Sequence, residues 1–336
     1  MGNLIVSQSP HAHGSDSVEK SMYGVIIALL PALLASFYFF GLGSLIVCLV
    51  SVAACVFFEW AICKALLKRE PTLLDGSAIV TGLLLGMNLP SNFPLWMIIV
   101  GSLIAIGVGK MTFGGLGQNP FNPALVGRCF LLVSFPTAMT TWPKEGMNMT
   151  FLDAATDANT GATPLALMQQ AVKGDASALD KLPTAWDMFI GNMQGGGAGT
   201  IGEICALALL LGLAFMLWRK IITWHIPVSI IGTVFVIAGI LYLVDDKQFA
   251  DPFQVIFAGG LMLGAIFMAT DYVTSPMTHK GQLIYGVSIG VLTIIIRNWG
   301  AYPEGMSFAI LIMNAFTPLI NTYVKPKRFG EVLVKE

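Results

Sequence analysis

The sequence predicts an all-α protein that crosses a membrane many times, and its composition and hydropathy predict this class. Of the 336 residues, 55% are hydrophobic and only 11% are charged, whereas soluble domains carry about a quarter charged residues. The mean hydropathy is +0.76, and several apolar runs are long enough for membrane helices. The net charge of -1 and the lack of a basic stripe argue against nucleic-acid binding.

Ten apolar segments are the expected transmembrane helices, five on each side of a long polar interval. They cover residues 23–40, 44–63, 77–89, 95–108, 124–135, 201–218, 222–244, 253–269, 283–296 and 307–323. The third and fifth segments are short for a crossing of about 20 residues. The fifth follows a loop rich in Gly, Asn and Pro at 113–123, and such interrupted backbone is tolerated only inside a bundle.

These segments divide the chain into five parts. They are an N-terminal arm at 1–20, a first membrane repeat at 21–135, a polar loop at 136–200, a second membrane repeat at 201–323 and a basic tail at 324–336. The first apolar run begins near Tyr23 and is too long for the core of a cleaved signal peptide. Two units of five spans imply inverted repeats, because an odd-numbered unit flips when it is duplicated.

The distribution of Lys and Arg predicts the orientation. With the N-terminus inside, most of the positive charge falls in inner segments, including Lys64, Lys68, Arg69, Lys110 and the tail. The outer segments then hold only Lys144, Lys173, Lys181, Lys247 and Arg297, and Arg128 is left unassigned. By the positive-inside rule, both termini are expected in the cytoplasm and the polar loop outside.

The most distinctive polar stretch is Asn-Thr-Gly-Ala-Thr-Pro at 159–164, within the polar loop. Thr163 is expected to cap a helix by accepting a backbone hydrogen bond, with Pro164 in the first helical position. A hydroxyl at a helix N-terminus can also carry a phosphoryl group, because the free N–H groups there favour the phosphate charge. Gly161 and Ala162 leave room for a modifying enzyme, so capping and modification are compatible.

Five further stretches complete a resemblance to a known family. They are Ser-Pro-His at 9–11, Ile-Ile-Ala-Leu-Leu-Pro-Ala at 26–32, Asn-Pro-Phe-Asn-Pro-Ala at 119–124, Gly-Thr-Ile-Gly-Glu at 199–203 and Met-Ala-Thr-Asp-Tyr-Val-Thr-Ser-Pro at 268–276. With these and Thr-Gly-Ala-Thr at 160–163, the chain resembles the D subunits of Rnf complexes. That family is related to the B subunits of Na⁺-translocating NADH:quinone reductase and implies ten helices in a urea-transporter-like fold.

The resemblance implies a membrane subunit of a redox-driven ion pump in the bacterial cytoplasmic (inner) membrane, not catalytic alone. Rnf couples electron transfer between ferredoxin and NAD⁺ to Na⁺ or H⁺ movement. The implied cofactor is FMN, joined by a flavin transferase through a phosphoester to Thr163 of the motif Thr160-Gly161-Ala162-Thr163. A second, non-covalent flavin such as riboflavin is left open. The implied partners are the bilayer and Rnf subunits A, B, C, E and G, with G exchanging electrons with the outward-facing flavin.

Acidic residues within or beside the apolar segments are candidates for an ion path, because a charge inside a membrane is costly. They are Glu59, Asp75, Glu203 and Asp271. Three of them lie at predicted span ends, where interfacial water is an adequate alternative. Asp271 is preferred because Thr270, Thr274 and Ser275 supply hard oxygen ligands beside it, and Thr274 is taken as its partner. Asn119, Asn122 and Arg128 are expected to order the broken fifth segment, with contact to an aromatic ring as the alternative.

No metal site is expected from the sequence. His11 and His13 lie two residues apart in a polar arm that offers no further ligand nearby. The cysteines lie in or beside apolar runs without a Cys-x-x-Cys pair, so they are interpreted as packing thiols. They are Cys48, Cys55, Cys63, Cys129 and Cys205.

Two other functions remain open at this stage. The B subunit of the quinone reductase would add a quinone site, and it usually carries a longer N-terminal extension than this chain has. A passive urea-type solute channel would share the architecture but would not require an acceptor at Thr163. Covalent flavin on the denatured polypeptide separates the channel from both redox subunits.

Overall fold

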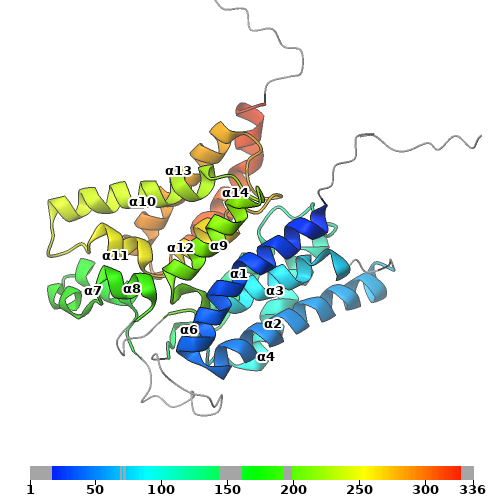
Figure 1. Cartoon of the computed structure of the whole chain (residues 1–336), viewed down its shortest axis with the longest axis horizontal. Coiled ribbons are helices and arrows are strands. Elements are labelled where there is room, and N and C mark those ends of the chain that lie inside the picture. Colours follow the sequence, from blue (N-terminus) through cyan, green and yellow to red (C-terminus); the bar gives the residue numbers. More distant parts are fainter. Residues whose placement is uncertain (1–16, 69, 71–72, 144–160, 193–198, 327–336) are drawn as a thin grey trace, which may run out of the picture.

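The computed structural model describes residues 17–68, 70, 73–143, 161–192 and 199–326. The described residues form helices joined by turns and short connections, without a β-strand (Figure 1). This agrees with the predicted all-α membrane class. The arm with His11 and His13, Thr160 of the motif and the end of the basic tail lie outside the described residues.

The first half contains five helices that correspond to the predicted spans, and two of them continue as π-helices. They are α1 (Val18–Phe40), α2 (Leu42–Ala61) with a π-helical extension (Ile62–Leu66), α3 (Ser77–Met87), α4 (Leu95–Leu103) with a π-helical extension (Ile104–Val108), and α5 (Pro123–Ser134). The Ser17 hydroxyl caps α1 by accepting from the Lys20 N–H. Gly41, at φ 68°, allows the sharp turn into α2.

Three short helices follow in the polar part of the chain. They are α6 (Pro136–Thr140), α7 (Pro164–Val172) and α8 (Ala185–Ile190). The start of α1 and the end of α14 (Met306–Tyr323) lie in the upper part of Figure 1, whereas α6, α7 and α8 lie in the lower part. Near α8, Gly191 closely approaches the Phe39 ring at the far end of α1. The polar helices therefore lie at the end of the molecule away from the start of α1.

The second half repeats the mixture of long and interrupted helices. It contains α9 (Ala206–Trp218), α10 (His225–Val244), α11 (Pro252–Phe257), α12 (Leu261–Leu263) with a π-helical continuation (Gly264–Met268), α13 (His279–Trp299) and α14. The predicted span 253–269 is thus broken at 258–260. The predicted span 201–218 begins as a helix only at Ala206, after a separate 3₁₀ turn at Ile201–Glu203.

Six of the described helices are long and apolar enough to cross a membrane. They are α1, α2 and α4 with their extensions, α10, α13 and α14. The other four predicted spans fall on α3, α5, α9 and the interrupted segment α11–α12. The chain is therefore a polytopic helical membrane protein in which short or broken segments accompany the long helices.

Small residues let α3 lie directly against α2. A Cβ atom on Gly82 would lie 2.6 Å from the Val52 Cα, and one on Gly86 would lie 2.9 Å from the Cys48 Cα. Close backbone approach of this kind is typical of membrane helices, which gain little from burying apolar side chains against one another in lipid. The short helix α3 is buried along most of its length as a result.

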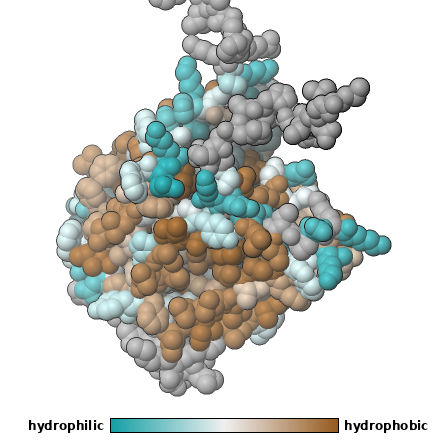
Figure 2. Space-filling model, turned by 45° about the vertical axis from the view of Figure 1, so that its right-hand side comes forward, coloured by the Kyte–Doolittle hydropathy of each residue, from teal (hydrophilic) through white to brown (hydrophobic). Residues whose placement is uncertain are grey.

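The outer surface of the helices is apolar, as a lipid-facing surface must be. Leu34 and Leu49 are 67% and 60% exposed in the first half, and Leu211 and Val236 are each 57% exposed in the second half. Figure 2 shows hydrophobic side chains in a broad band across one face, with hydrophilic side chains gathered above it. Inside, one large core cluster joins buried residues of both halves. The two halves therefore form one membrane domain.

Candidate functional site

Thr163 begins α7, as the sequence predicts. Its backbone is extended (φ -73°, ψ 154°), its hydroxyl oxygen accepts a hydrogen bond from the Ala166 N–H at 3.2 Å, and Pro164 occupies the first helical position. The side chain is only 6% exposed. Thr163 therefore presents a hydroxyl at the N-terminus of a helix of nine residues, where a negative group is favoured.

Three hydrogen bonds hold the segment around Thr163. The Gly161 N–H donates to the Trp142 carbonyl at 3.2 Å. The Gln169 side chain donates to the Gly300 carbonyl at 2.9 Å, and Gln248 donates to the Val172 carbonyl at 2.9 Å. The position of Thr163 is therefore fixed by Trp142 and by two contacts with the second half of the chain.

A cavity of about 190 Å³ adjoins Thr163. Its wall combines small residues, aromatic rings and acids from both halves. The lining includes Trp142, Gly161, Ala162, Gly199, Glu203, Gly259, Tyr302 and Glu304. Gly161 and Ala162 of the motif thus lie beside Thr163 on the cavity wall, while Thr160 lies outside the described residues.

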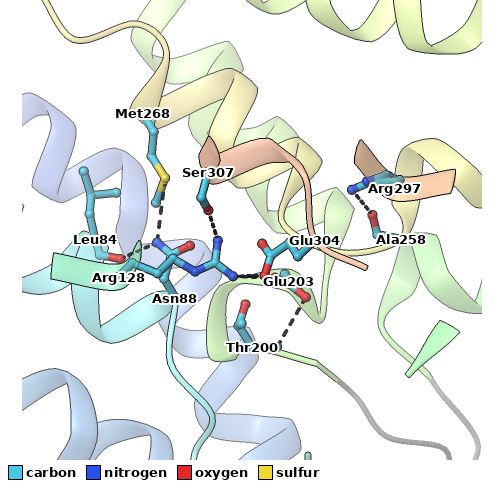
Figure 3. A network of polar contacts seen from close by, with 10 residues as sticks. All are labelled: Leu84, Asn88, Arg128, Thr200, Glu203, Ala258, Met268, Arg297, Glu304 and Ser307. Atoms are coloured by element: carbon cyan, nitrogen blue, oxygen red, sulfur yellow. Dashed lines mark hydrogen bonds and ion pairs between the residues drawn. The ribbon is translucent and has the colours of Figure 1, made fainter. Parts of the chain in front are cut away.

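A buried charge cluster, which we call the Arg128 cluster, borders this cavity through Glu203 and Glu304. Figure 3 shows the Arg128 guanidinium between Ser307 and Glu304, with Glu203 beside it. Arg128 donates to the Ser307 hydroxyl and to Glu304 Oε2, and its Nη2 lies 3.9 Å from Glu203 Oε1. Glu203 Oε2 accepts from the Thr200 N–H at 3.3 Å. The cluster joins α5 of the first half to two connections of the second.

Arg297 lies close by and holds the broken helix in place. Its guanidinium donates to the Val255 carbonyl at 2.8 Å and to the Ala258 carbonyl at 2.9 Å. Those carbonyls lie at the end of α11, where the helix stops and its own donors are missing. Arg297 is only 5% exposed, so it is a structural residue. The sequence analysis counted Arg297 among the charges of the outer loops, and that assignment was wrong.

Asp271 and Thr274 line a different part of the molecule. The Thr274 hydroxyl donates to Asp271 Oδ2 at 3.2 Å. The Thr270 hydroxyl donates its hydrogen bond to the Ile266 carbonyl at 2.6 Å and not to the Asp271 carboxylate. Asp271 borders a cavity of about 80 Å³ together with Asn119, Asn122 and Lys110. Ser21 and Met22, near the start of α1, border it too, so Thr163 and Asp271 belong to opposite ends of the molecule.

Asn122 orders the fifth segment, as expected. Its side-chain oxygen accepts from the Ala124 and Leu125 N–H groups and caps α5, and its amide donates to the Met268 carbonyl at 3.1 Å. Asn119 donates to the Phe121 carbonyl at 3.0 Å within the same loop. Arg128 contributes through its ion pairs. These contacts connect the first half to the π-helical continuation of α12 at Met268.

Glu59 and Lys110 form a second buried ion pair. The sequence did not predict it, because interfacial water was considered sufficient for acids at the ends of spans. Glu59 is 2% exposed and lies within α2, where Lys110 Nζ donates to both of its carboxylate oxygens at 2.8 and 2.7 Å. Lys110 also donates to the Ser77 hydroxyl at 2.6 Å. Lys110 is 1% exposed, so it too was wrongly counted as a loop charge. The sequence did offer one indication of this pair: an acid within the second apolar segment and a base directly after the fourth.

The cysteines are free thiols within the packed helices. Cys48, Cys55, Cys63 and Cys205 are buried and Cys129 is partly buried. Among the described residues, no group of three or more His, Cys, Asp or Glu side chains is arranged to hold a metal ion. The burial of the thiols agrees with their interpretation as packing residues.

Comparisons with known proteins give one consistent result. A profile of the NQR2, RnfD, RnfE family matches residues 5–330. The chain is 45% identical over 334 residues to the D subunit of the Na(+)-translocating ferredoxin:NAD(+) oxidoreductase complex of Acetobacterium woodii, covering 99% of this chain and 98% of the relative. It is 42% identical to the proton-translocating counterpart from Clostridium ljungdahlii, covering 97% and 96%. It is 39% identical to the D subunit of the ion-translocating oxidoreductase complex of Yersinia pseudotuberculosis, covering 97% and 98%.

Proposed function

Because the chain belongs to the NQR2, RnfD, RnfE family, we propose that it is the D subunit of an ion-translocating ferredoxin:NAD⁺ oxidoreductase, the Rnf complex. The observation that carries this proposal is the match over nearly the full length to relatives that bear that name. The chain is a subunit of a translocase and is not catalytic alone. Its partners in this proposal are the A, B, C, E and G subunits and the lipid bilayer.

We further propose that Thr163 carries FMN through a phosphoester, attached by a flavin transferase. Its hydroxyl borders a cavity, and α7 offers a helix N-terminus to the phosphate. Trp142 and Tyr302 supply aromatic surface to the same cavity, and Gly161 and Gly199 leave space along its wall. The residues present therefore fit a phosphate with a planar ring system. Bound FMN would accept electrons in pairs and release them singly, which lets it join unlike electron carriers.

The proposed orientation places Thr163 outside the cytoplasm and both termini inside, so that the G subunit can exchange electrons with the flavin. It rests on the loop and tail charges of the sequence that remain after Lys110 and Arg297 are removed from the count. Ten crossings in two inverted repeats, in a urea-transporter-like fold, belong to the same proposal. A reporter fused after Glu336 should be cytoplasmic, and one inserted near Gly174 should be external. The opposite result would reject the orientation and the electron exchange with the G subunit.

The Asp271 cavity is the place we propose for ion handling. Asp271 and Asn119 place polar atoms in it beside the apolar side chains of Val25 and Phe267. The Asp271→Asn substitution should weaken coupled ion transport more than it weakens flavin attachment. Normal pumping by a fully assembled Asp271→Asn complex would reject this role.

Covalent flavin is tested on the denatured polypeptide. The wild-type chain, expressed with its flavin transferase, should fluoresce in a denaturing gel and gain the mass of one FMN. Thr163→Ala should lose both signals, Thr163→Ser should keep part of the labelling, and Thr160→Ala should lower it without removing it. A Thr163→Ala chain that still gains the mass of FMN would place the attachment elsewhere. An unlabelled wild-type chain would instead favour the passive channel.

A further inference from the structure

The Arg128 cluster contains acceptor atoms that nothing in the described structure satisfies. Glu203 Oε1 and Glu304 Oε1 are buried and accept no hydrogen bond, although most buried polar atoms in proteins have a partner. The Glu203 residue is 9% exposed and the Glu304 side chain is 13% exposed. Two carboxylate oxygens shielded from bulk water therefore lack donors.

These two oxygens converge on the break between α11 and α12. A Cβ atom on Gly260 would lie 2.6 Å from Glu304 Oε1 and 3.1 Å from Glu203 Oε1. Two ionised carboxylates that share a buried site repel one another, so the ionisation of both at once is disfavoured. Only a residue without a side chain fits between them at position 260.

The nearby cations do not supply the missing donors. Arg128 pairs with both carboxylates through its Nη2 but donates to neither of the two free oxygens. Arg297 also interacts electrostatically with both carboxylates, but its two hydrogen bonds go to the Val255 and Ala258 carbonyls. Glu203 Oε1 and Glu304 Oε1 therefore face one another without an N–H or O–H between them in the part of the chain that the structure describes, and a proton on one of them would supply that donor.

We propose that Glu203 and Glu304 share one exchangeable proton and deliver it to the Thr163 cavity. Both residues line that cavity, so a proton can pass between the pair and a group bound there. When the pair releases its proton, both carboxylates are ionised beside Arg128. When water at the same end of the molecule returns a proton, the pair is neutralised again. The repulsion between the carboxylates makes release and uptake easy to reverse.

The coupling of this proton to electron transfer rests on the proposed flavin at Thr163. A flavin bound there would take up a proton when reduced by a neighbouring carrier and release it when reoxidised. Glu203 and Glu304, which line the cavity, would hold that proton when the flavin does not.

The proton site is tested without flavin, by pH-difference infrared spectroscopy of the complex with Thr163→Ala. This complex should show the C=O band of a protonated carboxyl that disappears as the pH rises. Glu203→Gln and Glu304→Gln should each remove the band, because the remaining carboxylate is then ionised beside Arg128. Asp246→Asn, at an exposed acid in the connection between α10 and α11, is the matched control and should keep it. Glu304→Asp keeps a carboxyl and should shift the band.

Three results would overturn the proposal. They are a carboxyl band that survives both Gln substitutions, no titrating carboxyl band at any pH at which the complex is folded, and a band that disappears on addition of Na⁺ at constant pH. The last result would make the pair a sodium site. A separate measurement on the flavin-bearing complex addresses the coupling: the midpoint potential should depend less on pH in Glu203→Gln than in wild type. Failure of flavin attachment would leave the infrared result intact, so the two proposals fail separately.

Discussion

Two buried charge clusters lie at opposite ends of the membrane domain and differ in how completely their polar atoms are paired. In one, Lys110 uses its three donors on the two Glu59 oxygens and the Ser77 hydroxyl. In the other, Arg128 faces both Glu203 and Glu304, and one oxygen of each carboxylate is without a donor. In the first cluster both Glu59 oxygens have a donor, whereas the second leaves two carboxylate oxygens without one beside a cavity.

The difference separates an ion pair that holds helices together from a group of charges that can bind or exchange a cation. Lys110 joins the segment after α4 to α2 and α3, and a closed pair of this kind gains nothing from a further ligand. Unsatisfied carboxylate oxygens beside an open space can be satisfied by a proton or another cation. Burial alone therefore does not distinguish the two roles, but the count of donors and acceptors does.

The largest expected effect is at the closed pair. Lys110→Met leaves Glu59 buried without a counter-charge, which should cost about 3–5 kcal/mol of stability. Thermal unfolding of the purified complex, or the yield of the folded subunit, measures this loss. Combining Lys110→Met with Glu59→Gln should recover much of it, and Lys247→Met in an exposed connection is the control. A Lys110→Met single variant as stable as wild type would contradict the structural role.

Unequal effects are expected when one acid is neutralised in each cluster, with the smaller loss of stability at the Arg128 cluster. Glu59→Gln leaves Lys110 buried with no carboxylate and should cost about 3–5 kcal/mol. Glu304→Gln leaves Arg128 with Glu203 and should cost only about 1.5–3 kcal/mol, the range for a hydrogen bond to a charged group. Unfolding of the two variants under the same conditions gives the comparison. If Glu304→Gln proved the more destabilising, the cluster at the Thr163 cavity would be as closed as the other.

The two serines give a finer comparison. The Ser77 hydroxyl accepts from Lys110 and donates to Asp75 Oδ1 at 2.7 Å, whereas Ser307 contributes one bond to Arg128. Ser77→Ala should therefore cost about 1–3 kcal/mol and Ser307→Ala about 1 kcal/mol. Equal losses in unfolding experiments would show that the second bond of Ser77 adds nothing.

The smallest effect on stability is expected at Thr163, beside the open cluster. Thr163→Ala removes one helix cap and should cost about 1 kcal/mol locally. The variant should therefore assemble with its partner subunits even though the proposed attachment site for flavin is removed. Size-exclusion analysis of the complex tests this. Loss of the whole subunit would mean that the hydroxyl supports the fold more than a single cap can.

Local features of this fold were predictable, and long-range pairs were not. Thr163 and Pro164 at the start of α7, and Asn122 before Pro123 at the start of α5, follow from capping rules that act within four residues. Glu59 and Lys110 are 51 positions apart, and Arg128 and Glu304 are 176 apart. Their meeting depends on how helices from distant segments pack, which hydropathy does not determine.

The break between α11 and α12 at 258–260 also depends on residues that are distant in the sequence. The apolar composition of the segment with Gly259, Gly260 and Gly264 predicted one continuous span at 253–269. α11 can stop there because Arg297 donates to the freed Val255 and Ala258 carbonyls, and Gly260 leaves room for the carboxylates of the Arg128 cluster beside the break. Arg297 comes from α13, and the carboxylates come from the connections before α9 and α14. The sequence around 258–260 therefore could not predict the break.

The hydrogen bond between Gly161 and Trp142 has a practical consequence for work on the protein. It fixes Gly161, two positions before Thr163, to Trp142, so the backbone on both sides of residues 143–160 is held by a contact within the described chain. An epitope inserted near residue 150, away from the motif at 160–163, should therefore leave the start of α7 in place. It would provide a label for following assembly of the complex in living cells.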